Sequence, residues 1–228
     1  MTARLLESHE IAPDTRHFVF ELAERDDFDY QPGQFISLVQ EVEGKSITRA
    51  YSLAGVPAGS RIELCLNIVE DGKLSPHLFS MQPGDSIDVK GPYGTFVFRE
   101  PRPTVMVATG TGVAPFRGML TRRLPQDAEH PYTLIFGVRE EPKLLYRQEF
   151  EALSARHANF QFLPTLTRPP EHWTGRSGRV QAHLLDFLGD RRDVDVYICG
   201  LKAMVDDVRA KLKELGFERK QIIFEKYD

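Results

Sequence analysis

The chain has 228 residues, which suits one large domain or two of about 100 to 130 residues, and we expect two. Hydrophobic residues make up 41% and charged residues 27%; no apolar run could cross a bilayer and residues 1–10 form no apolar leader, so we expect a cytoplasmic protein without a membrane span. A net charge of -4 gives no general attraction to nucleic acid. The chain has two cysteines, Cys65 and Cys199, which are too few for a disulfide framework, a zinc site or a four-cysteine iron–sulfur cluster. Any metal redox centre would belong to a partner.

The first hundred residues predict short strands separated by turns. Ile62, Leu64 and Leu66 alternate with more polar neighbours, the period-2 pattern of a strand with one face on a core. Pro-Gly and Asp-Gly pairs supply turns at near-regular spacing, which favours an antiparallel β-barrel or sandwich. The expected strands are Arg16–Leu22, Gln34–Val39, Ser46–Leu53, Arg61–Val69 and Asp85–Lys90.

The pattern changes at Glu100–Pro103, where two prolines in a charged stretch indicate a linker. We therefore expect a first domain at residues 1–99 and a second at residues 103–228. In the second, apolar runs alternate with helical stretches, which predicts an α/β domain with a parallel sheet. Apolar residues at steps of three and four predict a helix over Leu201–Leu215, ended by Gly216. The expected strands are Thr104–Ala108, Tyr132–Val138, Asn159–Leu163 and Val194–Cys199.

A glycine-rich turn follows the first of these strands and precedes a helix that we expect to open at Pro115. The turn reads Thr109-Gly110-Thr111-Gly112-Val113-Ala114-Pro115. Glycines without a Cβ let the backbone approach a ligand, and free N–H groups at a helix start favour an anionic diphosphate. A tight connection that binds nothing is the structural alternative. No third glycine follows at the spacing of the common dinucleotide fingerprint, so we do not predict the common dehydrogenase fold.

This turn resembles the NADP-binding turn of the ferredoxin-NADP reductase superfamily, bacterial type, and the first half of the chain carries a matching signature. Arg49-Ala50-Tyr51-Ser52 resembles the family's Arg-x-Tyr-Ser motif on a barrel strand. Alternate residues of a strand share a face, so Arg49 can offer a forked cation to a phosphate and Tyr51 a flat ring to an isoalloxazine. The resemblance implies a Greek-key FAD-binding barrel followed by a Rossmann-like nucleotide-binding domain, with the Ser52 hydroxyl close to flavin N5.

A second segment, Asp71–Pro76, resembles the stretch with which bacterial members hold the FAD diphosphate at the start of a short helix, and Gly91–Phe96 resembles the segment that closes the family's barrel. A capped surface helix is the structural alternative for the former. The resemblance implies that FAD is bound by Arg49, Ala50, Tyr51, Ser52, Asn67, Ile68, Val69, Gly72, Lys73, Leu74, Ser75 and Tyr227.

Near the C-terminus, Cys199-Gly200 resembles the family's Cys-Gly motif beside the nicotinamide, and Glu225 and Tyr227 resemble a terminal carboxylate and an aromatic ring near the flavin. Many members end on the aromatic residue, whereas this chain continues to Asp228. The resemblance implies catalytic roles for Ser52, Cys199 and Glu225. A buried core cysteine is the structural alternative for Cys199.

Coenzyme preference should be decided after the strand Asn159–Leu163, where an NADH enzyme places a carboxylate. Here Thr167 is neutral and Arg168 cationic, with Arg176 and Arg179 close behind, so we favour NADPH. The same stretch also resembles NADH-dependent haem-protein reductases. The implied NADP-binding residues are Thr109, Gly110, Thr111, Gly112, Val113, Pro115, Thr167, Arg168, Arg176, Arg179, Cys199 and Gly200.

The resemblance therefore implies a flavoprotein oxidoreductase that transfers hydride between NADPH and FAD and single electrons between FAD and a separate ferredoxin or flavodoxin. Three alternatives stay open: an NADH-dependent reductase of an oxygenase or haem-protein system, a free flavin reductase, and a nucleotide-sensing module without catalysis.

Overall fold

The computed structural model describes residues 1–42 and 44–227, and the chain divides into two compact units. Unit 1 contains residues 1–98 and 114–122; unit 2 contains residues 99–113 and 123–228. We had expected the domains at residues 1–99 and 103–228. This division places residues 99–102 in unit 2, and it places residues 114–122, which belong to helix α2 (Ala114–Arg123), in unit 1.

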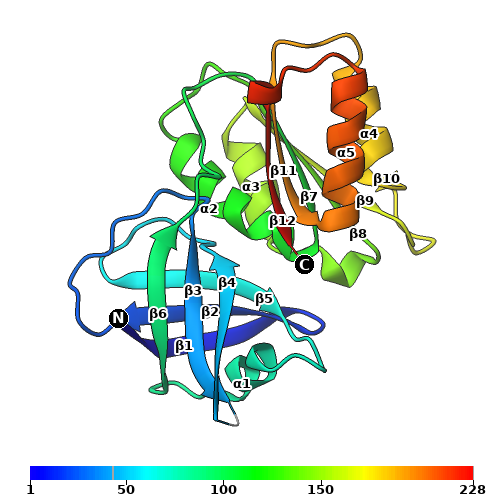
Figure 1. Cartoon of the computed structure of the whole chain (residues 1–228). Helices are drawn as coiled ribbons and strands as arrows, with labels where there is room; N and C mark the ends of the chain where they lie inside the picture. Colours follow the sequence, from blue (N-terminus) through cyan, green and yellow to red (C-terminus); the bar gives the residue numbers. More distant parts are fainter. Residues whose placement is uncertain (43, 228) are drawn as a thin grey trace. The chain divides into compact units, whose positions relative to one another are not determined.

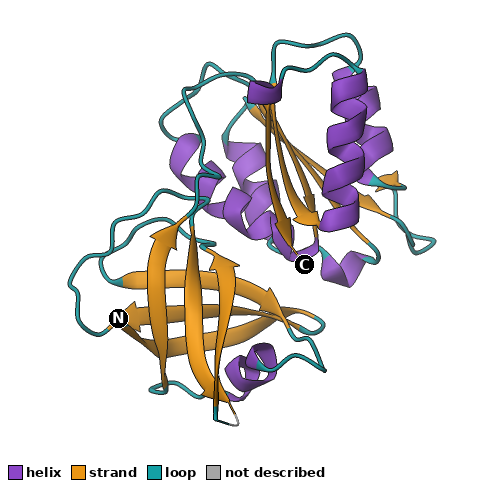
Figure 2. Cartoon of the chain, viewed as in Figure 1, coloured by secondary structure: helices purple, strands orange, loops and turns teal. Residues whose placement is uncertain are grey.

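Unit 1 is an antiparallel six-stranded sheet with strand order β4-β3-β6-β1-β2-β5. It consists mostly of strands and has one short helix, α1 (Figure 2). Leu53, directly after β4, bridges Leu64 on β5, so the two outer strands meet and the sheet curls into the expected barrel. The buried core is formed by alternate residues of these strands, with Phe18, Phe20 and Leu38 almost fully enclosed. The elements are β1 (Thr2–Ala12), β2 (Thr15–Leu22), β3 (Phe35–Val42), β4 (Lys45–Ser52), β5 (Arg61–Asn67), α1 (Leu74–Ser80) and β6 (Ser86–Tyr93).

Unit 2 is a parallel six-stranded sheet with strand order β10-β9-β8-β7-β11-β12. Its central strands β7 and β8 are buried along almost their whole length, which is typical of a parallel sheet covered on both faces. Helices α4 and α5 lie together on one face, and α3 lies on the other (Figure 1). The elements are β7 (Thr104–Thr109), β8 (Tyr132–Val138), α3 (Arg147–Arg156), β9 (Phe160–Leu166), β10 (Arg176–Ser177), α4 (Val180–Leu188), β11 (Asp195–Leu201), α5 (Lys202–Glu214) and β12 (Ile222–Tyr227).

The expected strands and the expected C-terminal helix are present, with small shifts at their ends. The helix is α5, whose residues Val205, Val208 and Leu212 are buried, and Gly216 follows it with φ 84°. The strand expected to reach Val69 ends at Asn67. Strands β1, β10 and β12 were not predicted. No helix in residues 1–42 and 44–227 is both long and apolar enough to cross a membrane.

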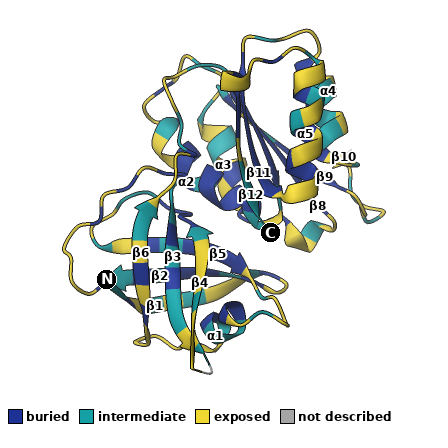
Figure 3. Ribbon diagram, viewed as in Figure 1, coloured by how far each residue is buried: buried dark blue, intermediate teal, exposed yellow. Residues whose placement is uncertain are grey.

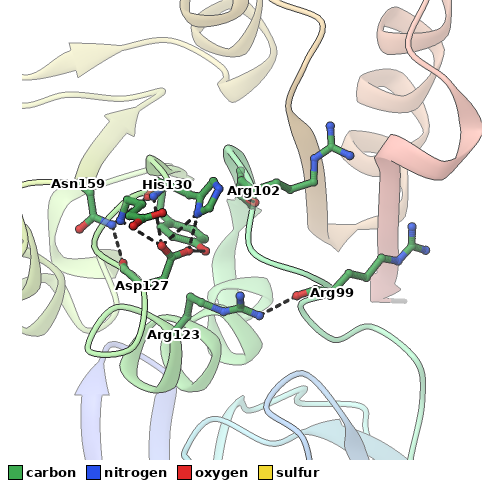
Figure 4. Close-up of polar contacts among 9 residues, drawn as sticks. Arg99, Arg102, Arg123, Asp127, His130 and Asn159 are labelled. Carbon is green, nitrogen blue, oxygen red and sulfur yellow. Dashed lines mark hydrogen bonds and ion pairs between the residues drawn. The ribbon is translucent and has the colours of Figure 1, made fainter.

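A closed polar network secures the loop before β8 (Figure 4). The buried Asp127 carboxylate accepts hydrogen bonds from the Tyr132 hydroxyl at 2.6 Å and from the backbone N–H groups of Glu129 and His130 at 3.1 and 3.2 Å. Asn159 donates to the carbonyl oxygens of Asp127 and His130, each at 2.8 Å. Burial alone would raise the pKa of Asp127, but the hydrogen bonds of its carboxylate with Tyr132, with the His130 side chain and with the two backbone N–H groups outweigh it and lower the pKa to about 2. The network lies at the end of the sheet where the parallel strands begin. The other end, at the carboxyl ends of the strands, is where ligands bind in sheets of this kind.

Candidate cofactor-binding sites

Strand β4 presents Arg49 and Tyr51 on one face. Opposite residues of an antiparallel pair share a face, and these two lie opposite Leu38 and Ile36, both of which are buried in the core of unit 1. Tyr51 is half-buried against that core, and burial raises its pKa to about 12, so the phenol is neutral. Arg49 is exposed and donates to the Thr48 carbonyl at 2.8 Å. An apolar ring and a cation therefore stand two residues apart on the rim of the barrel.

The adjoining residues of this motif alternate to the other face of β4. Ala50 is exposed, whereas Ser52, at the end of the strand, is only 6% exposed and lies opposite Phe35. The Ser52 side chain is therefore fixed by its surroundings.

The loop after β5 is closed by Ser75. Its Oγ accepts a hydrogen bond from the Val69 N–H at 3.0 Å and donates to the Val69 carbonyl at 3.5 Å. A Cβ at Gly72 would lie 2.8 Å from the same carbonyl oxygen, so the turn requires glycine there. We had expected Ser75 to offer its hydroxyl to a diphosphate; in the structure this hydroxyl holds the loop Asn67–Lys73 in shape. The expected diphosphate contacts in this segment therefore reduce to the backbone N–H groups at the start of α1 and the exposed side chain of Lys73.

In unit 2, the glycine-rich turn forms a 3₁₀ turn over Gly110–Val113, and α2 begins at Ala114, one residue before the expected Pro115. Gly110 has φ 54°, and a Cβ there would meet no atom within 4 Å. Thr109 Oγ1 is buried and has no hydrogen-bond partner among the described residues. The open space beside Gly110 and the unpartnered hydroxyl of the preceding Thr109 fit a ligand rich in oxygen atoms, such as a nucleotide diphosphate.

Gly112 meets a packing requirement that the sequence did not predict. A Cβ at this position would lie 2.4 Å from the Cys199 carbonyl oxygen and 2.6 Å from Gly200 Cα. The close approach at Gly112 is therefore between two segments of the protein itself, whereas a Cβ at Gly110 would meet open space. Binding of NADP by Gly112 stays a prediction. Gly200 has φ 143°, and a Cβ built at this position would lie 2.4 Å from Thr109 Oγ1. The close packing between the turn and the end of β11 therefore requires glycine at both position 112 and position 200.

The C-terminal strand brings the last predicted residues beside this turn. In the ladder between β11 and β12, Cys199 pairs with Glu225 and Leu201 with Tyr227, while Cys199 also pairs with Ala108 on β7. The Cys199 side chain is fully buried; burial and then the Glu225 charge raise its pKa, although a hydrogen bond with Tyr227 opposes them. The thiol is thus a small, neutral, enclosed group at neutral pH. Asp228 lies outside the described residues.

The residues expected to choose the coenzyme directly follow β9 or lie in and just after the short strand β10. The backbone N–H groups of Thr167 and Arg168 donate to the carbonyls of Val138 and Arg139 at 3.1 and 2.8 Å, and Arg176 lies beside Thr165. These contacts bring the two segments to one edge of the sheet.

Sequence reasoning overlooked the segment that follows β8 at the same edge, Arg139–Glu141. Glu140 lies 3.9 Å from Arg168 and Glu141 contacts Arg147 and His172. The side chains of Arg176 and Arg179 are exposed and have no ion pair within the described ranges. The position of Arg139–Glu141 directly after a predicted strand could have revealed them. In a parallel sheet, residues that directly follow neighbouring strands line the same ligand crevice.

Comparisons with known proteins agree with this arrangement. Residues 2–98 match the oxidoreductase FAD-binding domain and residues 106–210 match the oxidoreductase NAD-binding domain. The chain is 37% identical over 236 aligned residues to ferredoxin–NADP reductase B of Sorangium cellulosum (strain So ce56), with 99% of this chain and 97% of the relative covered. It is 32% identical to the toluate 1,2-dioxygenase electron transfer component of Pseudomonas putida, with 87% of this chain and 59% of that protein covered.

Among solved structures, the Amycolatopsis cytochrome P450 reductase GcoB has a TM-score of 0.89 and 29% identity, with 99% of this chain and 68% of the other covered. A ferredoxin NADP+ reductase from Neisseria gonorrhoeae with bound FAD and NADP has a TM-score of 0.83 and 25% identity, with 99% and 98% covered. The fold, the two matched domains and the full-length relative lead to one conclusion: the chain belongs to the ferredoxin-NADP reductase superfamily and is an NAD(P)H-dependent flavoprotein reductase whose cofactors are FAD and a nicotinamide dinucleotide.

Proposed function

We propose that this enzyme carries electrons between NADPH and a separate one-electron protein, a ferredoxin or a flavodoxin, through bound FAD, in either direction. The observation that carries the proposal is the 37% identity, over nearly all of both chains, to a ferredoxin–NADP reductase. Bound FAD and nicotinamide supply the hydride and electron-transfer chemistry themselves, so the protein has to bind, align and shield them. A cytoplasmic location remains a prediction.

On the flavin side, Tyr51 offers its half-buried ring to the isoalloxazine and Arg49 its guanidinium to the diphosphate. Ala50, Asn67, Ile68 and the segment Val69–Ser75 complete this site, with Ser75 holding the loop in shape. Ser52 is the candidate group beside the reacting flavin atom.

On the nicotinamide side, the open turn at Gly110 and the Thr109 hydroxyl bind the dinucleotide diphosphate. Cys199 and Glu225 are the candidate groups beside the nicotinamide, held next to each other by the β11–β12 ladder, and Tyr227 is the candidate aromatic ring for the flavin. Because the Cys199 thiol is neutral and enclosed, its contribution is one of shape, and it carries no proton to or from a substrate.

For the choice of coenzyme, Arg168, Arg176 and Arg179 are cations on exposed segments around the end of β9, and Thr167 brings no negative charge. A 2′-phosphate would find donors here. A second candidate function, an NADH-dependent reductase for an oxygenase or a haem protein, is favoured by Glu140, whose carboxylate lies 3.9 Å from Arg168, and by relatives such as the toluate dioxygenase component.

The decisive experiment is an anaerobic titration of the purified protein with NADPH and, separately, with NADH, followed in the visible spectrum. We expect a bound flavin that NADPH bleaches at lower concentration than NADH does, and whose electrons then pass to an added ferredoxin or flavodoxin. A protein that reduces no one-electron acceptor would overturn the proposal, and bleaching by NADH alone would favour the second candidate. Loss of all flavin during gel filtration would indicate a free flavin reductase, and bound flavin that neither nucleotide bleaches would indicate a sensor.

A further inference from the structure

Two of the proposed phosphate-binding arginines are held by the loop between β9 and β10: Arg168 lies near its start, and Arg176 is the first residue of β10, directly after it. The loop lies at the edge of the sheet of unit 2, where most of its side chains are exposed (Figure 3). A surface loop of this kind gains little from burial, so its shape depends on specific contacts.

One carboxylate, that of Glu141, connects this loop to helix α3. Glu141 Oε1 accepts from Arg147 Nη1 at 2.6 Å, and Glu141 Oε2 lies 2.8 Å from His172 Nε2. Arg147 also donates through Nε to Glu151 at 2.7 Å, so its guanidinium is oriented from two sides. The hydrogen bonds from Arg147 and His172 hold the pKa of Glu141 below its ordinary value. Glu141 is therefore ionised, and each of its oxygens is committed to a different segment.

Trp173 carries the connection onward to Arg176. The Arg147 guanidinium carbon lies 5.6 Å from the centroid of the Trp173 ring, a cation–π distance. The indole N–H donates to the Arg176 carbonyl at 2.9 Å. A Cβ at Gly175 would lie 2.6 Å from the ring, so the chain folds tightly around Trp173. Contacts thus run without interruption from Glu141 through Arg147 and Trp173 to the backbone of Arg176.

We propose that Glu141 is a positioning residue for coenzyme choice: through Arg147, His172 and Trp173 it holds the β9–β10 loop so that Arg168 and Arg176 face the 2′-phosphate of NADP(H). The inference rests on the proposed preference for NADPH. The expected effect of replacing Glu141 on phosphate affinity is opposite to the effect that simple electrostatics predicts. Removing a negative charge near a phosphate site should by itself tighten binding, whereas loss of the support for the loop weakens it.

The test compares Glu141→Gln with Glu140→Gln, which removes the same charge one residue away and contacts neither Arg147 nor His172. Binding of 2′,5′-ADP, which carries the phosphate but no nicotinamide, is measured by calorimetry on the flavin-loaded enzyme. We expect Glu141→Gln to raise the Kd about three- to tenfold, because the ion pair with Arg147 and the contact with His172 are both weakened. Glu140→Gln should leave the Kd unchanged or lower it.

Steady-state kinetics separate positioning from general damage. Glu141→Gln should raise KM for NADPH by the same factor, leave kcat within twofold and change KM for NADH little, because NADH has no phosphate to misplace. The fluorescence of Trp173, the single tryptophan of the chain, should shift to the red as the ring loses its cover. Trp173→Phe keeps the aromatic ring but removes the N–H donor to Arg176, and should raise the Kd by a smaller factor.

Equal or tighter 2′,5′-ADP binding by Glu141→Gln, or an equal fall in kcat with both coenzymes, would overturn the inference while leaving the proposed function intact. A wild-type enzyme that binds no 2′,5′-ADP and prefers NADH would overturn the NADPH preference and this inference with it.

Discussion

Replacing Gly112 by alanine tests why the nucleotide turn contains two glycines. The new Cβ would lie 2.4 Å from the Cys199 carbonyl oxygen and 2.6 Å from Gly200 Cα, far inside ordinary contact distance. Both are backbone atoms of β11, which is held on one side by β7 and on the other by β12. Neither segment can move without disturbing hydrogen bonds of the sheet. Overpacking of this kind costs about 1–3 kcal/mol, and the rigid neighbours place this case at the upper end.

A loss of about 2–3 kcal/mol should lower the Tm of the protein by about 4–12 °C for a chain of this size. The measurement is thermal unfolding followed by circular dichroism, with the nucleotide absent. Gly110→Ala is the matched control, because its φ of 54° is costly for alanine but its Cβ would meet no atom within 4 Å. We expect Gly110→Ala to cost only about 1 kcal/mol and instead to weaken nucleotide binding. If Gly112→Ala unfolds within 1 °C of the wild type, the packing explanation is wrong.

Three further predictions concern the flavin, the coenzyme and the polar network of unit 2. Arg49→Ala should raise the Kd for FAD about 10- to 100-fold, because a charged hydrogen bond to the diphosphate is lost; unchanged flavin content after gel filtration would reject this role. Thr167→Asp should shift the ratio of kcat/KM for NADPH and NADH about tenfold toward NADH through repulsion of the 2′-phosphate, and an unchanged ratio would mean that the site lies elsewhere. Asp127→Asn should lower stability at pH 7 by about 1–3 kcal/mol in denaturant unfolding. Because the folded-state pKa of Asp127, about 2, is below the ordinary 3.8, this difference should be complete above about pH 4 and fade as the pH falls toward 2; a difference that persists unchanged in acid would contradict the role of the charge.

Local sequence patterns were sufficient to predict most strands of both sheets and the helix α5. Ile62, Leu64 and Leu66 alternate in the sequence and are buried in β5, and Val205 and Val208 lie on the buried face of α5. These elements carry their signal in their own apolar spacing, because each buries one face against a core.

The strands that sequence reasoning missed are defined by their partner strands and not by an apolar pattern of their own. Strand β1 carries Glu7, His9 and Glu10 at exposed or half-exposed positions, and it is a strand because β2 and β6 pair with it on either side. Strands β10 and β12 are outer strands, each with one neighbour in the sheet. Hydrogen bonding to a partner strand leaves no periodic trace in the segment itself.

The grouping of α2 with unit 1 has a similar cause. Arg117 donates to Glu63 at 2.6 Å and to the Ala54 carbonyl at 3.0 Å, and a Cβ at Gly118 would lie 2.1 Å from the Gly55 carbonyl oxygen. These partners are more than fifty residues away in sequence, so a break in composition near Pro103 could not reveal them.

The motifs likewise indicated which segments form the candidate sites but not what each side chain does there. That Ser75 closes a loop depends on the path of the chain between Val69 and Ser75. That Glu141 bridges α3 to the β9–β10 loop depends on the distance between segments that no motif relates.

The position of β7 in the middle of its sheet has a consequence for synthesis. One neighbour, β8, follows soon after it, but the other, β11, is added only near the end of the chain. Until then, the β11 side of an almost wholly buried strand lacks its hydrogen-bonding partner. In unit 1, the hairpins β1–β2 and β3–β4 form between consecutive strands, and β6, the last strand of this unit, then joins β1 to β3 before unit 2 is made. A chain interrupted before β11 would therefore contain the strands of the barrel together with an open, apolar sheet edge prone to aggregation.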